Sequence, residues 1–130
     1  MTHHYAAPVF YDALAREISF AKREGNLVGI VKFQLLENAT EDQMLYFANE
    51  LELAVRQHDL IARICGNEFA VLLRLDTEVE SAFKCLVARV ANFEKRGFRY
   101  AFISTDGTKG LVQVLAELDN PQILRPSITL

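Results

Sequence analysis

The 130-residue chain is poor in the residues that build disulfide frameworks and rigid loops. It has two cysteines, Cys65 and Cys85, three prolines and no tryptophan. Two cysteines are too few for a disulfide framework, and no cysteine and histidine spacing is typical of a zinc site. We therefore expect both thiols to be reduced, as in a cytoplasmic protein.

Long apolar runs and an excess of basic residues are also missing. No apolar run approaches the roughly 20 residues of a membrane span, and the first residues lack the basic and apolar regions of a secretory signal. Lys and Arg number 14 against 17 Asp and Glu, which gives a net charge of -3. No basic field therefore indicates nucleic acid or an anionic membrane. An anionic ligand would need a local site, and a membrane-bound parent or partner stays compatible with these features.

The apolar content suits one globular domain. Hydrophobic residues make up 51% of the chain, which is enough for a core in a domain of this size. No linker, internal repeat or low-complexity segment interrupts it. We expect a single domain over residues 1–130, with a core from about 8 to 118 and an irregular tail over 119–130.

Periodicity in the first half predicts helix, strand and helix. Apolar residues recur at helical spacing over 8–23, and residues 27–36 form a mostly apolar run typical of a central strand. Thr40 and Gln43 have the pattern of a capping box, which predicts a second helix that ends near residue 56 or 57.

The second half predicts a hairpin over 59–75, a helix that begins at residue 76 or 77, a strand over 98–104 and a helix over 110–118. The predicted buried stripe of the third helix is Val79, Phe83, Leu86, Val90 and Phe93. Together the elements predict an α+β, ferredoxin-like sandwich, in which helices flank a mostly antiparallel sheet.

The most informative segment is a polar tip between two apolar stretches. Residues 59–64 and 68–75 read as paired strands, and Cys65-Gly66-Asn67 as their turn, because Gly and Asn tolerate the backbone angles of tight hairpins. Arg56-Gln57-His58-Asp59 lies just before the first strand. A hairpin of this kind, preceded by an Arg-x-x-Asp motif, resembles the bacterial GGDEF domains, which are diguanylate cyclases.

The family's signature reads Cys65-Gly66-Asn67-Glu68-Phe69 in this chain. The resemblance covers about residues 10–118, is strongest over 41–76, and includes the family's spacing between Arg56-x-x-Asp59 and the hairpin. It implies the GGDEF fold in a degenerate form, similar to PelD-type receptor domains for cyclic di-GMP. The alternative is an unrelated sandwich with a polar hairpin.

The resemblance also implies where catalytic groups should stand. Family cyclases hold Mg²⁺ with carboxylates, one from the third signature position and one from an Asp at the end of the first strand. Here these positions carry Asn67 and Lys32, with Gln34 in the next slot. Cys65 replaces a glycine that lets phosphate approach the backbone closely. A lysine in a metal site repels the metal.

Two longer segments of the catalytic apparatus are missing as well. The connection over 35–39 is shorter than the nucleotide-binding segment of active members, and residues 111–118 lack the family's Lys/Arg pattern. We therefore predict no catalytic residues, no cofactor and no metal site, and keep an active cyclase as the less favoured reading. Glu68 is expected to pair with Lys32 across adjacent strands, and Arg63 to be solvated or ion-paired.

Arg56-x-x-Asp59 resembles the family's inhibitory site, which binds cyclic di-GMP. An Arg fork can donate to guanine O6 and N7 or to phosphate, while an Asp accepts from guanine N1-H and N2-H. We expect both side chains to project from one surface, with His58 free to stack on a base or face solvent. A second Arg would come from Arg89 or Arg74.

A purely structural origin of this motif is the alternative, since Arg suits a helix C-terminus and Asp suits a turn. The sequence thus supports two functions. One is a catalytically inactive bacterial signalling domain that binds cyclic di-GMP or a protein partner, with a ligand-dependent homodimer as one form. The other is a docking or dimerisation domain that binds no nucleotide.

Overall fold

The computed structural model describes residues 5–36, 38–74, 78–119 and 121–124. The described elements are, in chain order, β1 (Tyr5–Ala6), α1 (Ala7–Glu24), β2 (Val28–Leu35), α2 (Glu41–Ala54), β3 (Leu60–Cys65), β4 (Glu68–Leu73), α3 (Val79–Phe93), β5 (Phe98–Thr105), α4 (Leu111–Leu118) and β6 (Gln122–Leu124). No helix in the described part of the chain is long and apolar enough to cross a membrane.

One six-stranded sheet forms the middle of the molecule, in the order β1-β3-β4-β2-β5-β6. Every neighbouring pair is antiparallel except β1 and β3. Strand β2 is central, and all its residues except Lys32 and Gln34 are buried. The predicted α+β class and the mostly antiparallel sheet are confirmed.

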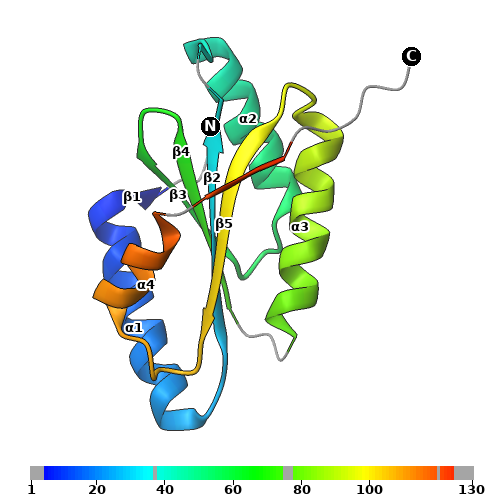
Figure 1. Cartoon of the computed structure of the whole chain (residues 1–130). Coiled ribbons are helices and arrows are strands. Elements are labelled where there is room, and N and C mark those ends of the chain that lie inside the picture. Colours follow the sequence, from blue (N-terminus) through cyan, green and yellow to red (C-terminus); the bar gives the residue numbers. More distant parts are fainter. Residues whose placement is uncertain (1–4, 37, 75–77, 120, 125–130) are drawn as a thin grey trace.

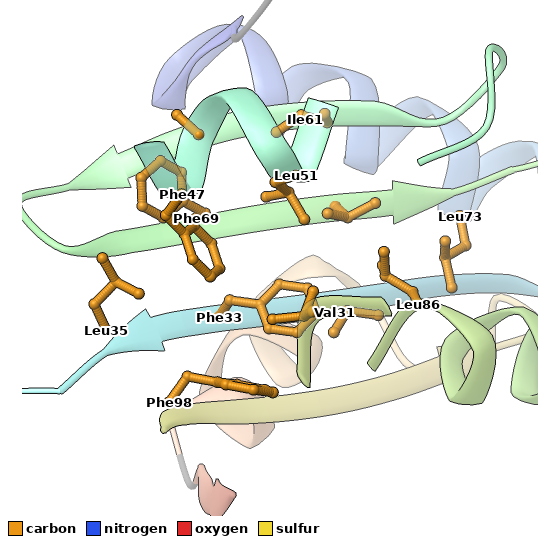
Figure 2. Close-up of a cluster of buried hydrophobic side chains, with 13 residues drawn as sticks. Val31, Phe33, Leu35, Phe47, Leu51, Ile61, Phe69, Leu73, Leu86 and Phe98 are labelled. Carbon is orange, nitrogen blue, oxygen red and sulfur yellow. The ribbon is translucent and has the colours of Figure 1, made fainter. Parts of the chain in front are cut away.

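Helices cover both faces of the sheet (Figure 1), with α1 and α4 on one face and α2 and α3 on the other. Figure 2 shows the core on the α2 and α3 face, where rings from three strands and α2 meet. Phe33 packs edge-on against Phe47 and Phe98, with ring centroids 6.2 and 5.8 Å apart. A second core, built around Phe10 and Leu14, lies between the sheet and the other two helices.

The helix ends follow signals that the sequence carries. The Thr40 side chain accepts from the Gln43 backbone, and the Gln43 side chain accepts from the Thr40 backbone, so the predicted capping box is present. Gly25 ends α1 in the left-handed region with φ 72°, where a glycine costs least. The start predicted for the third helix, at 76 or 77, lies outside the described residues.

Helix α2 ends at Ala54, earlier than the predicted residue 56 or 57. The cause is a turn that the next residues make instead. Asp59 N donates to Arg56 O at 3.0 Å, and the Asp59 carboxylate accepts from Arg56 N at 3.2 Å. A local side-chain acceptor of this kind competes with the helix for backbone donors.

The irregular tail predicted over 119–130 is wrong at residues 122–124. These residues form β6, which pairs with Phe98–Tyr100 of β5. At the opposite edge Tyr5 and Ala6 pair with Ala62 and Arg63, ahead of the predicted core. Strands of two or three residues are too short to show an alternating pattern, so periodicity does not detect them.

Candidate functional site

The predicted ion pair between Lys32 and Glu68 is confirmed. Lys32 Nζ lies 3.3 Å from Glu68 Oε1, and the two side chains are only 17% and 20% exposed. The strand register places Lys32 opposite Ala70 and Gln34 opposite Glu68. Lys32 therefore reaches Glu68 diagonally on one face of the sheet, a separation that long side chains can span.

A second carboxylate completes this cluster. Asp119, which follows α4, places Oδ1 3.3 Å from Lys32 Nζ, although its side chain is 76% exposed. Burial alone would lower the pKa of Lys32, but the two carboxylates outweigh it and the pKa is raised. The ammonium group is therefore held charged between Glu68 and Asp119. Sequence reasoning missed Asp119, which no motif marks.

The same cluster borders a pocket of about 210 Å³ between α1 and α4. Tyr11 lines it, and burial raises the pKa of its hydroxyl. Phe10 and Leu118 supply apolar walls. The pocket therefore joins a small apolar cavity to a lysine held between carboxylates.

Asn67 and Cys65 stand at the tip of the hairpin between β3 and β4. Asn67 Nδ2 donates to Leu35 O at 2.7 Å, and Leu35 N donates to Asn67 O at 3.0 Å, so Asn67 ties the hairpin to the end of β2. Cys65 is a free, exposed thiol, and Gly66 stands in the turn with φ 34°. Asn67 thus serves the hairpin as a structural link.

The donor set does not fit a divalent cation. Hard cations such as Mg²⁺ take oxygen ligands at about 2.0–2.6 Å, whereas an ammonium group stands between the two carboxylates here. Within residues 5–36, 38–74, 78–119 and 121–124, no three His, Cys, Asp or Glu side chains gather as a metal site would require. We therefore assign no metal-dependent step to these residues.

Arg63 is ion-paired, one of the two states that the sequence predicted. Its guanidinium donates to both carboxylate oxygens of Glu41, at 3.0 and 3.3 Å, and to Gly66 O at 2.9 Å. It also lies 5.9 Å from the centre of the Phe69 ring. The hydrogen bonds from Arg63 lower the pKa of Glu41. Arg63 thus links the start of α2 to the hairpin.

Arg56 and Asp59 contact each other closely. Arg56 Nη2 lies 2.9 Å from Asp59 Oδ1, and Arg56 Nε lies 3.0 Å from Oδ2. The Asp59 side chain is 2% exposed and that of Arg56 is 32% exposed. The expectation that both side chains project from one surface is therefore wrong for Asp59. Its oxygens already accept from Arg56 and from Arg74 N, the latter at 3.4 Å.

His58 and Arg74 both lie close to Asp59. His58 Nε2 is 3.9 Å from Asp59 Oδ1, is buried from solvent and has no hydrogen-bond partner among the described residues. Arg74 donates to His58 O at 2.8 Å and pairs with Glu17 at 3.3 Å. Arg74 is therefore bound within the fold.

Arg89 stands with Arg56 and Asp59 around one cavity of about 330 Å³ between α2 and α3. Arg89 is exposed, and its Nη1 donates to Ala54 O at 2.7 Å, at the end of α2. Of the two arginines that the sequence left open, Arg89 is the one that lines this cavity. Spacing could not distinguish them, because the choice depends on how α3 packs beside α2.

No protein-family model matches the sequence, and no curated protein matches it. Solved structures do. The GGDEF domain of YfiN (TpbB) from Pseudomonas aeruginosa matches with TM-score 0.77 and 17% identity, over 91% of this chain and 81% of that one. The GGDEF domain of DgcB from Caulobacter crescentus, in complex with c-di-GMP, matches with TM-score 0.73 and 17% identity, over 91% and 82%.

The diguanylate cyclase SiaD from Pseudomonas aeruginosa, in complex with its activator SiaC, matches with TM-score 0.75 and 16% identity. That match covers 91% of this chain and 53% of SiaD. The order of helices and strands predicted from the sequence agrees with these likenesses. The chain has the fold of the GGDEF domains.

Proposed function

We propose that this chain is a non-catalytic domain of the GGDEF fold that binds cyclic di-GMP at the cavity between α2 and α3. The observation that carries the proposal is the gathering of Arg56, Asp59 and Arg89 around that one cavity. The sequence predicted Arg56 and Asp59 as a ligand site and left the second arginine open between Arg89 and Arg74. Of these two, Arg89 lines the cavity, although it lies far along the chain from the other two residues.

The chemistry of the cavity suits this ligand. Two guanidinium groups, from Arg56 and Arg89, can donate to a guanine edge or to a phosphate. A volume of about 330 Å³ is at the small end of the usual range for ligand sites. The cavity would hold one base or phosphate, with the rest of the ligand on the surface around it.

Asp59 has a positioning role in this proposal. Its carboxylate fixes the Arg56 guanidinium through two hydrogen bonds and fixes the turn through Arg56 N. A guanidinium that is already oriented loses less conformational entropy when it binds a ligand. Arg56 and Arg89 would make the ligand contacts.

The position and charge of Lys32 support the proposed absence of catalysis. Condensing two GTP molecules requires cations that neutralise the triphosphates. Lys32 stands where the resemblance puts a metal-binding carboxylate, and it is charged and paired with Glu68 and Asp119. We expect no conversion of GTP with Mg²⁺ or Mn²⁺ by the purified chain.

A second candidate function is a docking domain that binds no nucleotide. The bonding of Asp59 favours it, because a side chain that is 2% exposed and bound to Arg56 has little capacity left for a guanine edge. The complex of SiaD with its activator SiaC illustrates such an interaction in a protein that contains this fold.

Calorimetric titration of cyclic di-GMP separates the two candidates. Arg89→Ala is the sharper variant, because Arg89 is exposed and its removal takes away neither member of the Arg56–Asp59 pair. We expect it to weaken binding at least tenfold, since a charge-assisted hydrogen bond is worth about 1.5–3 kcal/mol. Lys84→Ala is the matched control. Lys84 lies on the same helix, has a 72% exposed side chain and does not line the cavity. Its replacement therefore removes the same charge from a position outside the proposed site.

Binding that survives Arg89→Ala, or no heat from the unaltered chain at high micromolar ligand, would contradict the proposed site. Production of cyclic di-GMP from GTP would contradict the absence of catalysis independently of that result.

A further inference from the structure

Strand β5 has a partly unpaired edge. All eight of its residues pair with β2 on one side. On the other side β6 pairs only with Phe98–Tyr100, and Figure 1 shows it crossing only the first part of β5. Pro121 precedes β6 and has no N–H, so it cannot extend the ladder. In the described part of the chain, residues 101–105 have no strand on this side.

A concavity of about 670 Å³ lies along residues 100–103 of this edge. One wall is aromatic. Phe83 from α3 stacks on Phe102, with ring centroids 4.2 Å apart and an interplanar angle of 7°. The other wall carries Gln113 and Glu117 from α4, and Gln122 of β6 also lines the concavity. The edge therefore lies between an apolar wall and a polar wall.

Alternation along β5 decides which wall a neighbouring strand would meet. Phe98, Tyr100 and Phe102 belong to or pack against the core beneath α2 and α3, whereas Ala101 and Ile103 do so on the α1 and α4 side. A strand added to the edge alternates in the same way. Its successive side chains would face the aromatic pair and then Glu117.

The carboxylate of Glu117 gives this site a preference for a positively charged side chain on the added strand. Its Oε1 lies 3.1 Å from Lys109 Nζ, while Oε2 is buried and has no hydrogen-bond partner among the described residues. The side chain as a whole is 36% exposed. The terminal torsion of a glutamate is broad, so rotation of the carboxylate can present either oxygen to an incoming donor.

We propose that the edge of β5 over residues 101–105 binds an extended segment of a partner protein by strand addition. The segment would alternate apolar residues, which face Phe83 and Phe102, with Lys or Arg, which pairs with Glu117. Backbone hydrogen bonds supply affinity in this mode and alternate side chains supply specificity. A second copy fits less well, because residues 101–105 contain no basic residue to meet Glu117.

An acetylated and amidated seven-residue peptide of alternating Val and Lys is a suitable probe for the full ¹⁵N-labelled chain. We expect saturating peptide to slow hydrogen exchange at least tenfold at every second amide between residues 101 and 105. The same peptide with a central Pro should bind at least tenfold more weakly, because it lacks a backbone donor.

Specificity for the basic side chain is tested at Glu117. Glu117→Gln should weaken the Val–Lys peptide about tenfold, and it should leave an alternating Val–Ser peptide unchanged. Val112→Ala serves as a control, because Val112 lies on α4, is 83% exposed and does not line the concavity. It should change the affinity of neither peptide more than about twofold.

Three results would overturn the proposal. Slow exchange of these amides in the free monomeric chain would mean that the edge is already paired. Protection that appears only when the chain dimerises, with dimerisation monitored by sedimentation, would mean that the edge binds a second copy of the chain. Peptide-induced changes confined to other strands would place the site elsewhere. None of these outcomes depends on Arg89 or on cyclic di-GMP.

Discussion

The proposed absence of catalysis depends most on the contact between Lys32 and Glu68, and the energy of this contact can be measured. At 3.3 Å the Coulomb attraction is about 5 kcal/mol for an effective dielectric constant of about 20. Desolvation of both groups offsets most of it. For side chains that are 17% and 20% exposed, we expect a net coupling of about 1–2 kcal/mol, between surface and buried pairs.

A double-mutant cycle isolates this term. Lys32→Met leaves Glu68 beside Asp119 without a cation, so we expect the free energy of unfolding to fall by about 2 kcal/mol. Combining it with Glu68→Gln should recover about 1 kcal/mol of that loss. Asp119, whose side chain is 76% exposed, should add less than about 0.5 kcal/mol. Urea denaturation, with equal slopes for all variants, provides the free energies.

The pH dependence of this coupling has a defined sign. The pKa of Lys32 is raised above its ordinary value of 10.5. Its contribution to stability is therefore fully present below pH 10.5 and lost as the pH rises through the higher folded pKa. A coupling energy within about 0.5 kcal/mol of zero at neutral pH would refute the reasoning.

Three further perturbations test neighbouring parts of the structure. Lys32→Asp replaces the ammonium between two carboxylates with a third carboxylate, so millimolar Mn²⁺ should raise the thermal midpoint of this variant but not that of Lys32→Met. A midpoint of Lys32→Asp that is the same with and without Mn²⁺ would contradict the close approach of Glu68 and Asp119 to residue 32. Gly107→Ala should cost at least about 2 kcal/mol, because the residue has φ +101° and a Cβ there would stand 2.6 Å from the backbone of α1; Gly110→Ala, with open space around it, should cost less than about 1 kcal/mol in the same urea assay. Arg63→Ala should raise the pKa of Glu41 toward 4.5 in an NMR titration, since Arg63 now lowers it; any stability from this pair is present above pH 4.5 and lost as the pH falls through the lower folded pKa.

Local signals in the sequence predicted most of the fold. The capping box at Thr40 and Gln43 was readable because both partners lie within one helical turn. The contact between Lys32 and Glu68 was predictable because the resemblance placed both residues in one site on adjacent strands. Each of these inferences needed only a short offset or one strand pairing.

Features that depend on packing between distant segments were not predictable. The burial of Asp59 follows from the way α2 ends and from Arg74, which directly follows β4. The choice of Arg89 over Arg74 depends on how α3 lies beside α2. Asp119 accepts a hydrogen bond from Lys32, 87 residues away in the sequence, and no sequence motif predicts this contact. The site was therefore predictable in its residue types and only partly in its arrangement.

The most direct test of the proposed function is a ¹⁵N NMR titration of the whole chain with cyclic di-GMP. Saturable shifts are expected for the amides of residues 54–59 and of those around Arg89, with little change near Lys32 and Glu68. The absence of saturable shifts at high micromolar ligand, or shifts that cluster around Lys32 and Glu68 instead, would contradict the proposed ligand site.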